Sequence, residues 1–100
     1  MANRGAGSEA LAAIDDALKA RPHKKGDELS RATRNLCALR DEMIGTQRRD
    51  GASPCRRDRL EQVNSIISVV LAVHFPLGDI PWEELEKARS WLAAILDHPG

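Results

Sequence analysis

One cysteine stands in a context that could activate a thiol. Cys55 follows a proline and precedes Arg56 and Arg57, and a helix start and neighbouring cations both favour the reactive thiolate. A cysteine nucleophile also needs a base, and the chain's three histidines lie in other segments, with no recognisable signature around the cysteine. These are His23, His74 and His98. We therefore expect no catalytic residue and predict that the protein is not an enzyme.

Residues that could hold a metal or a cofactor are scattered. The two cysteines and three histidines include no pair at the spacing of a zinc knuckle or a helical histidine pair. Adjacent carboxylates such as Asp15 and Asp16 point in different directions on a helix and cannot share a substrate. No glycine-rich loop follows a strand, so no phosphate cradle is expected. The prediction is no metal site and no cofactor.

Arginine is the residue type whose arrangement indicates a function. Five arginines flank the Asp50-Gly51 turn signal, and two more lie on the outside of the helix expected before it. Guanidinium groups bind carboxylates and phosphates bidentately, and arginine is enriched in protein interfaces. The candidate partner-binding arginines are Arg31, Arg34, Arg48, Arg49, Arg56, Arg57 and Arg59.

Charge is segregated along a chain that is neutral as a whole. Residues 19–59 carry twelve Lys or Arg against six Asp or Glu, and residues 60–100 carry two against six. Such a dipolar surface can steer an encounter with a charged partner. Part of the positive charge cancels locally, because Asp27 and Glu28 can pair with Arg31, and Glu61 with Arg57. An ordinary charged surface is the alternative interpretation.

The expected partner is a protein or a ribonucleoprotein complex. The basic region has no aromatic residue on which a base could stack, and the near-neutral charge is atypical of a nucleic-acid binder. The long helices expected on either side of the turn do not fit a helix-turn-helix. Trp82 is a second candidate contact, because tryptophan and arginine dominate interface energies. Its alternative role is a lid on the end of the core.

The elements that position these residues are predicted to be four helices. Apolar residues recur at intervals of three and four, and Ser8, Asp27, Ser53-Pro54 and Pro81 supply start signals, with Asp79 or Ile80 as the last cap. The expected helices are 8–20, 27–47, 54–74 and 81–98. Their inward stripes are predicted as Leu11, Ile14 and Leu18; Leu29, Ala32, Leu36, Leu39 and Met43; Leu60, Val63, Ile67, Val70 and His74; and Leu85, Ala88, Leu92, Ile95 and Leu96.

The prediction is an all-α fold, a small antiparallel four-helix bundle with short loops. A strand competes over 63–73, where β-branched residues are dense, but it would lack a pairing partner. The chain of 100 residues is one domain, 1–100, with 1–7 flexible. The apolar surplus of Ile66, Val69 and Val73 leaves open a homo-oligomer in which another copy covers these residues.

Together these features predict a non-enzymatic helical protein-interaction module. In kind it is similar to the small inhibitors of phages and mobile elements, such as anti-CRISPR proteins, although no residue pattern assigns it to them. A nucleic-acid-binding regulator using the same arginines is the alternative, and a homo-oligomeric structural module is another. Without a secretory leader or a long apolar segment, no membrane association and a cytoplasmic location are expected. Two cysteines in such a chain are expected to be free thiols.

Overall fold

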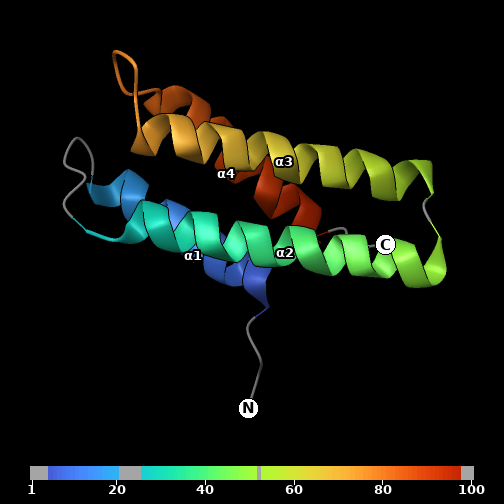
Figure 1. Ribbon diagram of the computed structural model, residues 1–100. Helices are drawn as coiled ribbons and strands as arrows, with labels where there is room; N and C mark the ends of the chain where they lie inside the picture. Colours follow the sequence, from blue (N-terminus) through green and yellow to red (C-terminus); the bar gives the residue numbers. More distant parts are fainter. Residues whose placement is uncertain (1–4, 21–25, 52, 98–100) are drawn as a thin grey trace.

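The computed structural model describes residues 5–20, 26–51 and 53–97. Within these ranges the chain forms helices and no strand, so the all-α prediction is confirmed and the strand alternative over 63–73 is wrong. Figure 1 shows the four helices packed as a bundle. They are α1 (Ala6–Ala20), α2 (Glu28–Asp50), α3 (Pro54–His74) and α4 (Trp82–Asp97).

The start of α3 is the best-formed helix end. The hydroxyl of Ser53 accepts a hydrogen bond of 3.2 Å from the backbone N–H of Arg56, and Pro54 occupies the first turn. A serine that caps a helix satisfies an amide that would otherwise lack a partner. The predicted start at Pro54 is therefore confirmed, and it sets the direction in which α3 leaves the turn.

Removal of this cap has a measurable expected cost. Ser53→Ala is expected to lower the free energy of unfolding by about 1 kcal/mol, because the amide of Arg56 loses its acceptor. Urea unfolding followed by circular dichroism measures the change. Ser90→Ala, at an exposed position inside α4, is the matched control and should change stability by about 0.5 kcal/mol or less. Equal losses in the two variants would show that the cap contributes nothing.

Three other helix ends differ from the prediction, one of them the start of α4, which lies at Trp82 and not at Pro81. The first helix begins before Ser8, because the N–H of Glu9 bonds to the carbonyl of Gly5, so residues 6 and 7 of the segment expected to be flexible are helical. Helix α2 continues three residues past Gln47. It ends where Gly51 adopts a positive φ of 88° and donates its N–H to the carbonyl of Gln47. Glycine adopts this conformation at little cost.

The core is shared by all four helices. Each helix packs against its neighbours in the chain, and α1 closes the ring by packing on α4. No helix contributes fewer than three buried apolar residues. The core residues are Ala10, Ala13, Ile14, Ala17, Leu29, Ala32, Leu36, Val63, Ile66, Ile67, Val70, Val73, Leu85, Ala88 and Leu92.

The prediction for the inward face of α1 is confirmed for Ile14, which is buried, and only in part for Leu11 and Leu18, which pack against the core but keep some exposure. Apart from Ile14, the buried face is made of small residues. A Cβ atom added to Gly7 would lie 2.5 Å from Cδ2 of Leu96, so the Leu96 side chain of α4 packs directly on the backbone of α1 at this point. Small residues on the buried face permit such direct packing. The small buried residues are Gly7, Ala10, Ala13 and Ala17.

Helix α3 fills the centre of the core. Ile66 and Val73 are completely buried within the single chain, while Leu60 and His74, which were predicted to face inward, are only partly buried. Two of the three residues that a second copy was expected to cover are thus already covered. The premise of the homo-oligomer alternative is wrong for Ile66 and Val73, and only Val69 retains partial exposure.

An ion pair that the sequence did not suggest joins the first helix to the last. The guanidinium of Arg89 on α4 donates hydrogen bonds of 2.8 and 3.4 Å to the two carboxylate oxygens of Asp15 on α1. These hydrogen bonds and the charge of Asp15 raise the pKa of Arg89 above its ordinary value. Because arginine is already protonated at physiological pH, this shift adds no pH dependence there.

Helices α2 and α3 extend past the other two at one end of the bundle (Figure 1). The turn between them projects from that end, and the last apolar residues of the α2 and α4 stripes are only partly buried there. Those residues are Leu39, Met43, Ile95 and Leu96. None of the helices in the described ranges has the length and apolar character to cross a bilayer.

Candidate functional site

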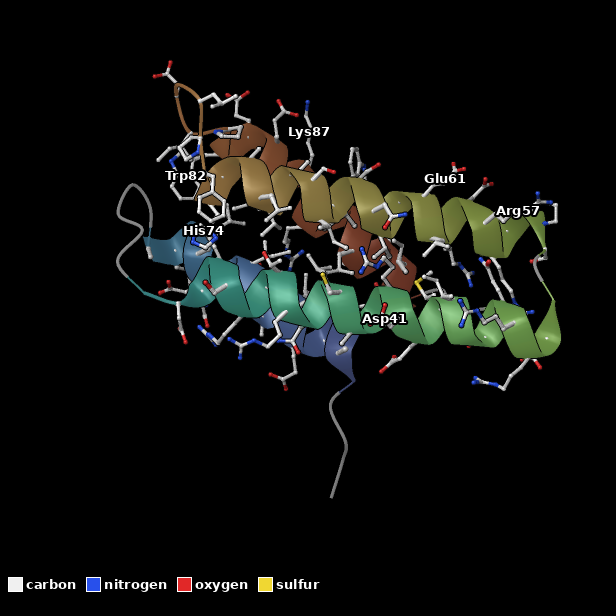
Figure 2. The ribbon with its side chains drawn as sticks, viewed as in Figure 1. Asp41, Arg57, Glu61, His74, Trp82 and Lys87 are labelled. Carbon is white, nitrogen blue, oxygen red and sulfur yellow. The ribbon has the colours of Figure 1, made fainter. Side chains whose placement is uncertain are left out.

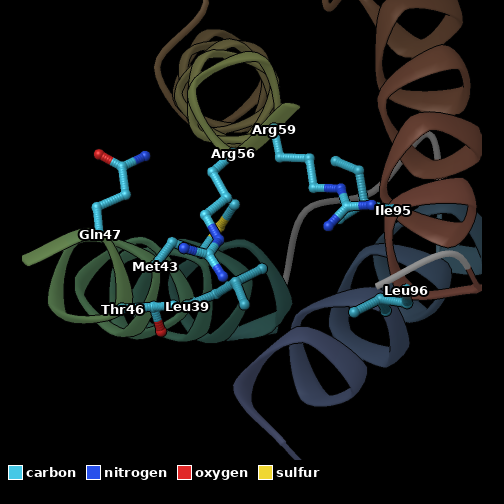
Figure 3. Close-up of a pocket in the computed structure, with 8 residues that line it drawn as sticks. All are labelled: Leu39, Met43, Thr46, Gln47, Arg56, Arg59, Ile95 and Leu96. Carbon is cyan, nitrogen blue, oxygen red and sulfur yellow. The ribbon is translucent and has the colours of Figure 1, made fainter. Parts of the chain in front are cut away.

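The α2–α3 turn brings five of the predicted arginines together. Two come from the last turn of α2 and three from the first two turns of α3, because the connection between the helices is only a few residues long. Arg48, Arg49 and Arg57 are exposed. Arg56 and Arg59 are partly buried, and Figure 3 shows their side chains projecting from α3 into the space toward α2 and α4. We call these five residues the arginine turn.

Hydrogen bonds hold two members of the arginine turn in place. Nη1 of Arg56 donates to the carbonyl oxygen of Gly51 at 2.8 Å, and Nη2 of Arg49 donates to Oγ1 of Thr46 at 3.4 Å. For Arg48 and Arg57, no hydrogen bond or ion pair with any described residue is present, so the pairing of Arg57 with Glu61 that was expected does not form. Their guanidinium groups are therefore available to a partner.

An open cavity of about 230 Å³ lies beneath the arginine turn (Figure 3). Its apolar lining comes from α2 and α4, and its polar lining comes from α2 and α3. At this end of the bundle α1 begins and α4 ends short of α2 and α3 (Figure 1), so within the described residues these two helices do not cover the last part of the apolar stripes. The lining residues are Leu39, Met43, Thr46, Gln47, Arg56, Arg59, Ile95 and Leu96.

One polar atom beside this cavity lacks a partner. Nε2 of Gln47 is buried, and the described part of the chain offers it no hydrogen-bond acceptor. Buried donors are nearly always paired in native proteins, because desolvation without a hydrogen bond costs free energy. Among the described residues that line the cavity, the charged ones are Arg56 and Arg59. A bound group that accepts hydrogen bonds and carries negative charge would match both features.

The other two candidate arginines do not belong to this site. Arg31 precedes Arg48 by seventeen residues on the same helix, which separates them by about 25 Å at 1.5 Å per residue. Nε of Arg31 donates to Asp27 at 3.0 Å and Nη2 donates to Asp16 at 3.5 Å. Burial opposes the charged form of Arg31, but the charges and hydrogen bonds of these carboxylates outweigh it and raise its pKa.

The predicted arginine face is therefore two separate surfaces. Arg34 is exposed on the outside of α2, one turn from Arg31. Of the two local pairings expected for Arg31, the one with Asp27 forms, and Asp16 from α1 takes the place expected for Glu28. Because Arg31 is bound to its own chain, the surface formed by Arg31 and Arg34 offers less unpaired charge than the arginine turn.

Trp82 lies at the opposite end of the molecule from the arginine turn. Figure 2 shows it near His74, at the end of α3 farthest from Arg57. Trp82 is the first residue of α4 and is partly buried against the hydrophobic core. This placement matches a lid on the end of the core, the alternative role for this residue. A partner surface would have to span the length of the bundle to contact both Trp82 and the arginine turn.

The candidate nucleophile stands apart from the one histidine whose position is described. Cys55 is exposed in the first turn of α3, and His74 is the last residue of the same helix, about 28 Å away along its axis. His23 and His98 lie outside the described residues. No three histidine, cysteine or acidic side chains come together as a metal site within residues 5–20, 26–51 and 53–97.

Sequence reasoning found the arginine turn and missed the cavity. A signal was present in the lengths of the segments, because the apolar stripe predicted on α2 runs on to Leu39 and Met43, while α1 is only 15 residues long against 23 for α2. A short helix cannot cover the whole of a longer neighbour. Comparison of the chain with protein-family models, curated proteins and solved structures found no match.

Proposed function

We propose that the protein is a non-enzymatic interaction module that docks through the arginine turn on an acidic surface of a protein, either alone or within a ribonucleoprotein complex. The observation that carries the proposal is the grouping of five arginines at one turn of the bundle, two of which, Arg56 and Arg59, line a cavity with apolar walls. Arginines around an apolar depression resemble the centre of a protein interface, where desolvated charges surround an anchor.

The cavity favours a protein partner over a nucleic acid. A phosphate backbone can use exposed guanidinium groups, but it has no apolar group to place among Leu39, Met43 and Ile95. Bases would need aromatic platforms for stacking, and the described residues of the arginine turn and of the cavity include none. A protein surface can supply carboxylates and an apolar side chain together.

In the proposed mode of action, the protein occupies a surface of its partner and blocks other ligands from it. A typical interface buries about 800 Å² on each partner, so a small helical domain docked by one end can exclude another ligand from the same surface. This is the way in which small inhibitors of the phage and mobile-element type act in kind, and we propose an inhibitory role for this chain. The free thiols of Cys37 and Cys55 support a cytoplasmic location, because reducing compartments keep cysteines unpaired.

Charge reversal at the arginine turn tests this function. The double variant Arg48→Glu with Arg57→Glu is expected to weaken partner capture from a source-cell lysate by about tenfold, equivalent to about 1.4 kcal/mol, because repulsion replaces attraction. Both residues are exposed, so the helical circular dichroism should not change. Quantitative mass spectrometry of nuclease-treated eluates measures the amount of each captured protein.

The control variant makes the same change in net charge elsewhere. Lys19→Glu with Lys87→Glu alters two exposed residues on α1 and α4 and should retain the captured proteins. Equal capture by both double variants would contradict docking through the arginine turn. Material that disappears on nuclease treatment, with a binding constant that falls steeply with salt, would instead support the nucleic-acid alternative.

A further inference from the structure

The cavity beneath the arginine turn has the size of an aromatic ring. An apolar cavity of about 150 Å³ binds benzene, and the volume here is about 230 Å³. The apolar wall is built from two helices, with Leu39 and Met43 on one side and Ile95 and Leu96 on the other. A phenyl or indole ring inserted between these side chains would complete the end of the core that α1 and α4 leave open.

The charged and polar residues that line the cavity determine which chemical groups can lie beside a bound ring. The charged residues that the described part of the chain places at the cavity, Arg56 and Arg59, are both positive, so a carboxylate beside the ring is attracted and an ammonium group is repelled. A guanidinium has five N–H donors, so Arg56 can hold a carboxylate as well as its bond to Gly51. The unpaired Nε2 of Gln47 needs an acceptor, which a backbone carbonyl supplies.

We propose that this cavity binds an aromatic side chain that lies next to Asp or Glu residues in an acidic segment of the protein partner. The ring occupies the space between α2 and α4, the neighbouring carboxylates pair with Arg56 and Arg59, and a carbonyl of the segment accepts from Gln47. This inference rests on the proposed function for the existence of a protein partner. It adds the chemistry that the partner must present.

Methionine methyl signals give a direct test with model peptides. The chain contains two methionines, Met1 and Met43, and Met43 lines the cavity. In protein labelled with ¹³C at the methionine methyl groups, the acetylated peptide amide Glu-Glu-Trp-Glu-Glu is expected to shift the Met43 signal in a saturable manner. The variant Met43→Leu identifies which of the two methyl signals belongs to Met43.

Two matched peptides separate the ring from the charge. Glu-Glu-Ala-Glu-Glu keeps the charge and removes the ring, and Lys-Lys-Trp-Lys-Lys keeps the ring and reverses the charge. Each is expected to bind about tenfold or more weakly than the acidic tryptophan peptide, because each loses one of the two contacts. No shift of Met43 with the tryptophan peptide, or equal shifts with the alanine peptide, would overturn the proposal.

A variant that fills the cavity provides the second measurement. Ile95→Phe places a ring in the cavity and is expected to abolish the peptide-induced shift, while Ala38→Phe adds a ring at an exposed site on α2 and should preserve it. Strong peptide binding to the filled variant would overturn the assignment to this cavity. If the peptides fail but Arg48 and Arg57 remain necessary for partner capture, docking occurs by charge alone and only the present inference is lost.

Discussion

Leu36→Ala is expected to lower the free energy of unfolding by about 2–5 kcal/mol. Leu36 has no exposed surface and lies on α2, which packs against both α1 and α3. Removing its side chain loses the transfer free energy of three carbons and leaves a cavity that closely packed helices fill only in part. Small domains have total stabilities of about 5–15 kcal/mol. The variant should therefore unfold at a much lower urea concentration.

The matched control is the same substitution where the leucine is not buried. Leu71 on α3 is 39% exposed, and Leu71→Ala is expected to cost about 0.5 kcal/mol or less. Urea unfolding of both variants, followed by circular dichroism with the slope of the transition compared, measures the difference. Similar midpoints for the two variants would mean that the ring of four helices does not bury Leu36 as the structure shows.

Ala10→Leu, which adds carbon atoms to the core, is expected to destabilise the protein by about 1–3 kcal/mol. Ala10 has no exposed surface and lies on the small-residue face of α1, one turn from Gly7, where α1 approaches Leu96 closely. Added carbon atoms in a filled core force side chains out of their preferred rotamers or push helices apart. Thermal or urea unfolding measures the loss of stability. Because leucine has a helix propensity close to that of alanine, the loss reports on packing.

Ala38→Leu tests whether this effect comes from packing. Ala38 is exposed on α2, so the same addition meets solvent and should change stability by about 0.5 kcal/mol or less. If Ala10→Leu were as stable as the unchanged protein, α1 would have room for its leucines to face inward. The stripe predicted from the sequence would then describe the fold better than the alanine face does.

Helix content and the start of α3 were predictable because they depend on neighbouring residues. Ser53 and Pro54 place the beginning of α3 through one side-chain hydrogen bond and one fixed backbone angle, both of which act within a single turn. The β-branched residues of 63–73 did not form a strand, because the described segments contain no second strand to pair with. Local propensity gives way when long-range pairing is impossible.

The orientation of α1 was predictable only in part from the same kind of pattern. Leu11, Ile14 and Leu18 form a stripe by hydrophobicity, but alanines occupy the adjacent stripe and are also apolar. The choice between the two depends on how closely α2 and α4 approach, which is a property of the whole bundle. At Gly7 the side chain of Leu96 takes the space that a Cβ atom would need, and the buried residues of α1 are Gly7, three alanines and Ile14.

The same division applies to the candidate site. The Asp50-Gly51 signal placed five arginines around one turn, and the structure has that turn, closed by Gly51. The sequence could not show that Arg31 would pair with Asp16 from another helix. The position of Trp82 at the far end of the bundle (Figure 2) does follow from the predicted antiparallel order, because α4 begins where α3 ends.

By itself, the sequence determined four amphipathic helices, their approximate limits and a basic turn between the second and the third, because these follow from residue spacing and capping over a few positions. Only the tertiary structure decided which face of α1 is buried, which arginines are held by the chain, and that a cavity opens beneath Arg56 and Arg59. The physical reason is that helix lengths and interhelical distances are set jointly by all four helices. The spacing of residues along one helix predicts which of them share a face, but it does not predict which other helix packs against that face.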